Sequence, residues 1–186
     1  MIYCGIDFSI NSTGICIINK NKLEFISFSR KVIAKKNLPV LDSLKIKLIE
    51  NLENKNSDEH AKLEDAIYTT NKIFELIKHC DIIGIEGLSF GSTGNRLAEI
   101  SGYQYLLRKL IHDTNKPFYI YPPKTIKKFV GNGNYDKEQI ISTFIQNEHN
   151  WLAIKLKKLS LTKHFKPIDD LIDAYYIVKM LKNIPK

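Results

Sequence analysis

The sequence contains few cysteines, no histidines at paired metal-binding spacing and no long hydrophobic run. Cys4, Cys16 and Cys80 are widely spaced in apolar segments, so they form neither a disulfide framework nor the paired thiols of a zinc site. We expect them to be small buried residues in a protein of a reducing compartment. The five histidines are also scattered along the chain. A metal site built from cysteine and histidine is therefore not expected.

Signals for membrane insertion and export are also missing. No apolar segment approaches the roughly 18 residues that a membrane-spanning helix needs. The N-terminus has no basic leader and carries Asp7 inside its first apolar run, so a signal peptide is not expected. The sequence predicts an intracellular, cytoplasmic protein without a membrane partner. Its abundance of Ile, Lys and Asn is typical of an AT-rich genome, bacterial or viral.

The chain has the length and composition of one globular domain with a basic surface. Its 186 residues are 44% hydrophobic and 26% charged, which is ordinary for a globular protein. They contain no internal repeat, low-complexity tract or domain boundary, so we expect a single domain over 1–186. The 28 Lys and Arg residues exceed the 20 Asp and Glu residues and give a net charge of +8. This excess favours a polyanionic partner, with nucleic acid ahead of an anionic membrane.

The pattern of apolar residues predicts an α/β fold with a mixed five-stranded sheet that helices cover on both faces. The predicted strands are 2–7, 14–18, 22–29, 81–86 and 117–121, the first three antiparallel and the last two parallel. The predicted helices are 41–52, 63–77, 97–110, 122–131, 136–148 and 166–179. The basic segment 150–166 is predicted to be irregular.

Four acidic residues stand out against this arrangement. Asp7 and Glu86 each end a short apolar strand, and sites in such sheets collect at the carboxyl ends of the strands. Asp170 and Asp173 are three residues apart and share one face of the last helix. Singly, Asp7 could be a turn residue, and the helical pair could be a solvated first turn. Asp169 is an alternative to Asp170.

Together the four acids favour a site for hard cations. Acidic clusters without histidine or cysteine suit Mg²⁺, with Mn²⁺ as a substitute. Two such ions about 3.5–4 Å apart promote hydrolysis of a phosphodiester. The sequence therefore indicates a metal-dependent nuclease.

At this point the chain resembles the RuvC-type Holliday junction resolvases of the RNase H-like superfamily. The motifs that carry the resemblance occur in this order: Gly5-Ile-Asp7, Ser12-Thr-Gly14, Ile85-Glu86, the stretch 117–137, and Asp170-Leu-Ile-Asp173-Ala174. The stretch 117–137 is similar to the family's strand, lysine-bearing helix, G-x-G turn and following lysine. Segment 37–80 is longer than in the family, and 150–166 has no clear counterpart.

The resemblance implies a structure-selective endodeoxyribonuclease that resolves four-way DNA junctions. Asp7, Glu86, Asp170 and Asp173 would hold the divalent ions, and Lys137 would lie beside the scissile phosphate. A homodimer would make paired symmetric nicks with 5′-phosphate ends. The candidate DNA contacts are Ser9, Ser12, Phe90, Asn95, Arg96, Lys124, Lys127, Lys128 and Lys137.

Some of these assignments leave alternatives open. Either Lys127 or Lys128 could correspond to the family's helical lysine. Phe90 could fill a core position or stack on an unpaired base at the junction. Trp151 and Tyr175 are expected in the core or at a dimer interface.

Other functions remain to be distinguished. A wider range of branched substrates, such as flaps and Y-junctions, is the nearest alternative. An actin-like ATPase also begins with a strand, an Asp and a Ser/Thr-Gly turn, although this chain is short for two such lobes. A non-catalytic junction-binding protein would have no use for four clustered acids.

Overall fold

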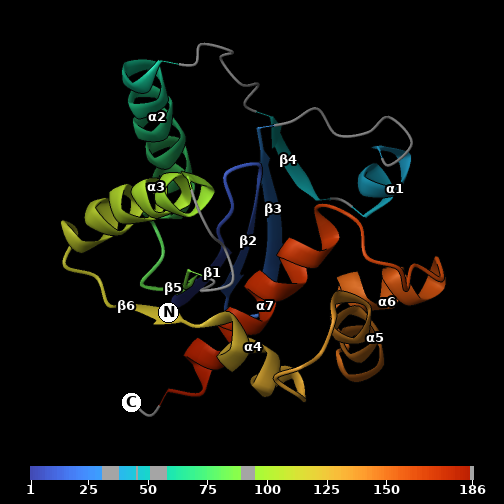
Figure 1. Cartoon of the computed structure of the whole chain (residues 1–186). Coiled ribbons are helices and arrows are strands. Elements are labelled where there is room, and N and C mark those ends of the chain that lie inside the picture. The colour runs from blue at the N-terminus through green and yellow to red at the C-terminus, as the bar shows by residue number, and fades with distance from the viewer. Residues whose placement is uncertain (31–37, 45, 51–57, 89–94, 185–186) are drawn as a thin grey trace.

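The computed structural model describes residues 1–30, 38–44, 46–50, 58–88 and 95–184. They form one mixed sheet with helices on both faces (Figure 1). The strands are β1 (Ile2–Asp7), β2 (Ser12–Asn19), β3 (Lys22–Ser29), β4 (Lys47–Glu50), β5 (Ile82–Glu86) and β6 (Phe118–Tyr121). The helices are α1 (Leu38–Ser43), α2 (Glu59–Ile77), α3 (Asn95–His112), α4 (Pro123–Val130), α5 (Lys137–Asn147), α6 (Trp151–Lys158) and α7 (Ile168–Lys182).

The sheet has the strand order β4-β3-β2-β1-β5-β6. The strands β1, β2 and β3 are antiparallel to one another, whereas β5 runs parallel to β1 and β6 runs parallel to β5. The predicted α/β class and the order of three antiparallel strands followed by two parallel strands are therefore confirmed. The count of five strands is one too low, because β4 adds a parallel strand beside β3.

Two hydrophobic cores lie on opposite faces of the sheet, because successive side chains of a strand point to opposite faces. Ile15 and Ile17 of β2 pack with α2 and α3, whereas Cys16 between them packs with α7. Figure 1 shows α2 and α3 on one side and α7 with α4, α5 and α6 on the other. The three cysteines are free and buried, as predicted.

The helix α7 is the centre of its layer and crosses the middle of the sheet. Ala174, Ile177 and Leu181 are all buried against the strands. Two strand glycines allow this close approach. A Cβ atom at Gly5 would collide with the carbonyl oxygen of Ala174, and one at Gly14 would overlap the backbone of Asp170. Glycine at these positions therefore sets how near the first turn of α7 lies to β1 and β2.

The predicted secondary structure was wrong in two segments. The stretch 41–52 was predicted to be one helix, but α1 ends at Ser43 and the chain then enters β4. Over so few residues, apolar spacing does not distinguish a helix from a strand, and β4 gains backbone pairing with β3. The segment 150–166 was predicted to be irregular, yet 151–158 forms α6.

The helix α6 forms because its apolar residues share one face. Leu152, Ala153 and Leu156 are buried, and the Asn150 side chain caps the helix by accepting hydrogen bonds from two backbone N–H groups. The lysines that suggested an irregular loop lie on its outer side. No helix in the described ranges is long and apolar enough to cross a membrane.

Candidate active site

The four predicted acidic residues lie at the end of the sheet where β1 and β5 finish, beside the first turns of α7. Ile6 of β1 pairs with Ile85 of β5 in a parallel register, so the next residues, Asp7 and Glu86, leave neighbouring strands side by side. Their carboxyl groups lie within hydrogen-bonding reach of each other. The strands thus supply two of the four carboxylates.

The first turns of α7 supply the other two carboxylates. Asp170 lies within hydrogen-bonding reach of Asp7. Asp173 lies one helical turn further along and interacts electrostatically with Asp7, Asp170 and Glu86. The four side chains therefore form one acidic cluster, which we define as Asp7, Glu86, Asp170 and Asp173. It joins three segments of the chain, with Glu86 79 residues after Asp7 and Asp170 84 residues after Glu86.

Neighbouring polar groups hold the backbone and side chains of this cluster in place. The Ser12 hydroxyl donates a hydrogen bond of 2.6 Å to Oδ2 of Asp170. The Ser9 hydroxyl donates to the Ser12 carbonyl oxygen at 2.7 Å and accepts from the Ser12 backbone N–H. On the opposite side, buried Gln104 of α3 donates to the backbone carbonyl of Glu86 at 3.3 Å. Ser9 and Ser12 thus brace the site, and their contact with DNA stays a prediction.

Burial and mutual repulsion destabilise the charged form of all four carboxyl groups. Burial is the main cause in each case, and it raises the pKa of Asp7 well above its usual range. The Glu86 carboxylate raises the pKa of Asp7 further. Burial and the Asp7 charge raise the pKa values of Asp170 and Asp173 in the same way. A set of acids that repel one another in a buried place favours a cation among them.

Two lysines supply positive charge beside the cluster. Lys166 pairs with Oδ1 of Asp170 and, at 3.4 Å, with Oδ2 of Asp169. Lys137, at the start of α5, also pairs with Asp169. Lys137 therefore lies next to the acids, as its predicted position requires, and its contact with a phosphate stays a prediction. Lys166 was not among the predicted site residues, although its spacing of four residues from Asp170 is a usual ion-pair spacing.

The structure distinguishes the environments of Asp169 and Asp170. Both side chains are buried, but Asp170 lies by Asp7 and Ser12, whereas Asp169 lies by the two lysines. The Oδ1 atom of Asp169 is buried without a hydrogen-bond partner. These contacts favour Asp170 as the member of the cluster, with Asp169 holding the lysines.

The acidic cluster fits a divalent cation by its donor chemistry. All of its ligands are carboxylate oxygens, which suit Mg²⁺ or Mn²⁺. In the described part of the chain, however, no three His, Cys, Asp or Glu side chains are arranged closely enough to hold an ion. Asp170, for example, directs its two oxygens to Lys166 and Ser12.

The basic helix α4 and the turn after it carry three of the predicted DNA contacts. Lys124 and Lys128 are exposed, whereas Lys127 is half-buried and donates to the backbone carbonyl of Tyr135 at 2.7 Å. Lys128 is therefore the freer of the two candidates for a phosphate contact. Phe90 lies outside the described residues. The side chains of Asn95 and Arg96 are also not described, although both residues belong to α3.

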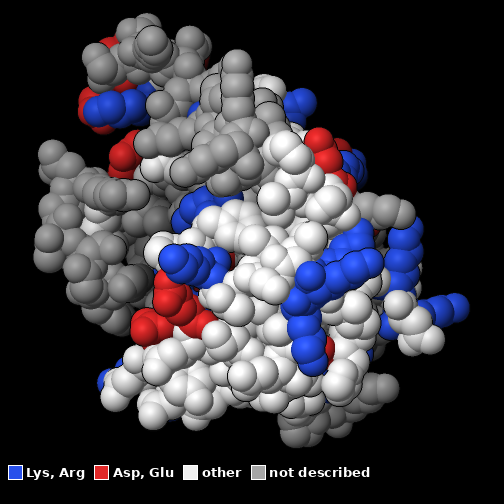
Figure 2. Space-filling view, turned by 90° about the vertical axis from the view of Figure 1, so that its right-hand side faces the viewer, with Lys and Arg blue, Asp and Glu red and all other residues white. Residues whose placement is uncertain are grey.

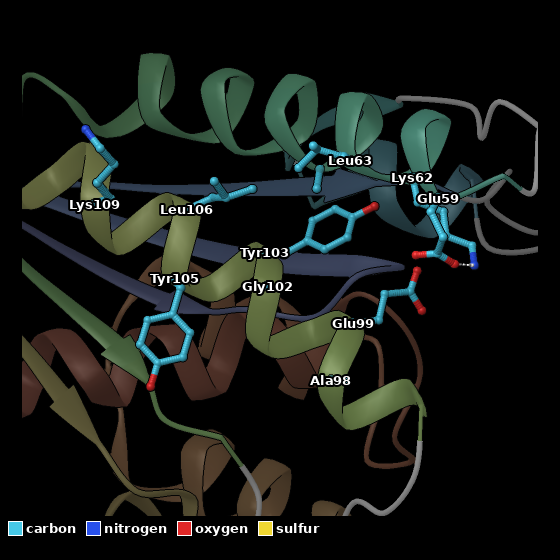
Figure 3. Close-up of a pocket in the computed structure, with 11 residues that line it drawn as sticks. Glu59, Lys62, Leu63, Ala98, Glu99, Gly102, Tyr103, Tyr105, Leu106 and Lys109 are labelled. Carbon is cyan, nitrogen blue, oxygen red and sulfur yellow. Dashed lines mark hydrogen bonds and ion pairs between the residues drawn. The ribbon is translucent and has the colours of Figure 1, made fainter.

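A cavity of about 840 Å³ lies apart from the acidic cluster, between α2 and α3. Figure 3 shows Leu63 of α2 and Leu106 of α3 facing the space between the two helices. Glu59 and Lys62 at one end form an ion pair of 2.7 Å. Its lining is mostly apolar and contains none of the four clustered acids. This cavity therefore marks an apolar surface and not the acidic site.

Comparison with solved structures identifies the fold. Thermus thermophilus RuvC matches with a TM-score of 0.52 and 15% identity over 96% of this chain and 91% of that chain. The same protein in complex with a Holliday junction substrate matches with a TM-score of 0.54 and 13% identity over 96% and 90%. Ydc2, the yeast mitochondrial Holliday junction resolvase, matches with a TM-score of 0.53 and 18% identity over 95% and 75%. No protein-family profile and no curated sequence matches the chain.

These likenesses cover nearly the whole chain and show its fold. The described residues share the mixed α/β architecture of Thermus thermophilus RuvC and of Ydc2. Within that α/β class, the chain has the fold of the RuvC-type Holliday junction resolvases, as its sequence motifs predict.

Proposed function

We propose that this protein is a divalent-metal-dependent endonuclease that resolves four-way DNA junctions by paired symmetric nicks. The observation that carries the proposal is the acidic cluster. On a fold shared with junction resolvases, carboxylates from β1, β5 and α7 meet at one edge of the sheet. Buried free thiols support action in a reducing, intracellular compartment.

The four carboxylates would hold Mg²⁺ or Mn²⁺ at the carboxyl ends of β1 and β5. When bound, such ions supply an activated water and stabilise the leaving oxygen of a phosphodiester. Asp7 and Asp170 are buried between the sheet and α7, and Glu86 and Asp173 are half-buried, which limits access of bulk water and strengthens their interactions. Ser12 orients Asp170 through its hydrogen bond. Lys137 is half-exposed beside the cluster and would contact a phosphate oxygen.

The distribution of charge supports DNA as the substrate. The net charge is +8, and Figure 2 shows basic side chains gathered on the side of the molecule that α5 and α6 form in Figure 1. Lysines on such a surface neutralise phosphates and release counterions, so binding weakens with salt. Lys124 and Lys128 of α4 are exposed as well.

A homodimer would place two acidic clusters on one junction. An observation that supports it is the apolar surface of α2 and α3, on which Leu63, Ile67, Tyr68 and Tyr105 are each at least 43% exposed. Large exposed apolar side chains that lie together often mark a protein interface. A dimer through this surface also explains why the cavity between the two helices is open.

We expect the protein to be a dimer in solution and Tyr105→Lys to shift it towards the monomer. A charged side chain in an apolar interface loses its hydration without a partner. Size-exclusion chromatography with light scattering measures the mass at several protein concentrations. Ile154→Lys is the matched control, because Ile154 is 57% exposed on α6. A monomeric wild type, or equal dissociation in both variants, would contradict this interface.

Cleavage of defined substrates tests the proposed activity. We expect the wild-type protein with Mg²⁺ to cut a labelled four-way junction at symmetric positions in two opposite strands, and EDTA to stop cutting. Flap, Y-junction and linear duplex substrates of the same sequence are the comparison. Equal cutting of flaps and Y-junctions would indicate a broader branched-DNA nuclease. Binding of the junction without cutting in Mg²⁺ or Mn²⁺ would contradict the enzyme assignment.

A further inference from the structure

Lys166 lies where the acidic cluster meets the first turn of α7. It precedes the helix, and its side chain reaches Asp170 four residues later and Asp169 three residues later. Both carboxylates are almost fully buried, with 2% and 3% of their side chains exposed, whereas the Lys166 side chain is 51% exposed. The ammonium group of this lysine thus contacts two buried carboxylates, although about half of its side chain is exposed.

Both oxygens of Asp170 already have partners in this arrangement. Oδ1 pairs with the Lys166 ammonium, and Oδ2 accepts the hydrogen bond of 2.6 Å from Ser12. The ammonium group is therefore the cation that this carboxylate contacts. A divalent ion that used Asp170 as a ligand would have to share Oδ1 with Lys166 or replace it. Two cations beside one carboxylate repel each other, so replacement costs less than sharing.

We propose that Lys166 is an internal counter-ion that divalent metal displaces, and that it sets the metal concentration at which the site fills. This inference rests on the proposed metal-dependent function and concerns a residue that no described motif of the family contains. Lysine suits this part because its ammonium is a point charge on a flexible four-carbon stem. Its side chain is half-exposed and so has a path to solvent, and Asp169 remains as a partner after it leaves Asp170.

Lys137 does not have the same position. Its ammonium pairs with Asp169, which has its own place beside the cluster, and no ion pair of Lys137 with Asp7, Glu86, Asp170 or Asp173 is present among the described residues. A metal ion that binds to Asp170 would therefore displace Lys166 and not Lys137. Competition of this kind links two equilibria, so removing the lysine increases metal affinity by the factor that its displacement costs.

The test measures Mn²⁺ binding without DNA, by calorimetric titration of the full chain. We expect Lys166→Gln to bind Mn²⁺ about tenfold more tightly than the wild type, within the usual range of such linkage. The metal-free variant should unfold at a lower temperature, because Asp170 loses its cation, and saturating Mn²⁺ should give it a larger rise in Tm than it gives the wild type. Lys163→Gln is the matched control, since it removes an exposed lysine three residues away in the same segment, and should stay within about twofold of the wild type.

Each outcome separates this inference from the proposed function. If the wild type binds Mn²⁺ but Lys166→Gln binds it equally or more weakly, the displacement idea is wrong and the metal site stands. If no variant binds Mn²⁺ at all, the metal-dependent function itself fails. Circular dichroism in metal-free buffer checks folding of each variant. Lys166→Met, which keeps the aliphatic stem, replaces Lys166→Gln in the titration if the latter is unfolded.

Discussion

Replacing Asp7 by asparagine is expected to lower the rate of junction cleavage by about 1,000-fold or more, while the protein still folds and binds the junction. Asp7 lies within hydrogen-bonding reach of Glu86 and Asp170 and interacts electrostatically with Asp173. Its loss removes a central anionic ligand, and the ligands position the ions that hydrolyse the phosphodiester. Single-turnover cleavage of a labelled four-way junction in Mg²⁺ measures the effect. Binding is measured separately in EDTA by gel shift.

The same substitution is expected to stabilise the metal-free protein. Asp7 has a pKa raised above its value in the unfolded chain, mainly by burial and then by Glu86. Such an acid favours the folded state at low pH and costs stability as the pH rises past the unfolded value. Asparagine removes this cost, so the gain in Tm should be larger at pH 8 than at pH 5. Thermal unfolding in EDTA at the two pH values tests it.

Glu75→Gln is the control for loss of a carboxylate, because Glu75 is exposed on α2 and pairs only with Lys78 in the described ion pairs. It should leave both the cleavage rate and the Tm close to those of the wild type. Full activity of Asp7→Asn would show that the acidic cluster is not the catalytic centre. Loss of activity together with loss of folding would instead indicate a structural role for Asp7.

Replacing Gly5 by alanine is expected to cost about 3 kcal/mol in the free energy of unfolding, at the upper end of overpacking effects. The new Cβ atom would collide with the backbone carbonyl of Ala174, which cannot change rotamer to avoid it. In a domain of this size, the loss corresponds to a fall in Tm of about 10 °C. Thermal unfolding of the two proteins measures it.

The same substitution should also slow cleavage, by about 100-fold, because α7 carries Asp170 and Asp173. Pushing this helix away from β1 moves two of the four carboxylates relative to Asp7, and displacements near 1 Å have effects of this size. Single-turnover cleavage below the Tm of the variant separates this effect from unfolding. A variant with normal stability and rate would show that α7 does not depend on the glycine for its position.

Gly102→Ala is the matched control for stability. Gly102 lies inside α3, and apart from its neighbours in the chain and the helix's own backbone, a Cβ atom there would meet nothing within 4 Å in the described structure. Alanine favours a helix over glycine, so this variant should be more stable by about 0.5–1 kcal/mol. Opposite signs for the two Gly→Ala substitutions would demonstrate that the close contact with α7, and not glycine itself, explains the loss.

The sequence pointed to these four acids because each one is marked by its local pattern. Asp7 and Glu86 end buried apolar strands, and Asp170 and Asp173 share one helical face. Lys166 lacks such a mark, since lysines are abundant in the preceding segment. Its importance arises from the orientation of the first turn of α7, which brings its ammonium to Asp170.

The errors in the predicted secondary structure have a similar origin. A short apolar run such as 46–49 fits a strand or a helix, and pairing with the edge of β3 decides for the strand. In α6, three buried residues and the Asn150 cap outweigh the lysines that suggested an irregular segment. Local propensity is a weak preference, and burial against α5 and the sheet overrides it.

By itself, the sequence determined the α/β class, the order of the central strands and the places of the four acids at two strand ends and on one helical face, because alternation and spacing are local properties of the chain. Tertiary structure alone decided how closely α7 lies on the sheet, which of Asp169 and Asp170 faces Asp7, and which lysine neutralises the cluster. The physical reason is that close packing and charge pairing depend on distances between segments that the chain joins only by folding.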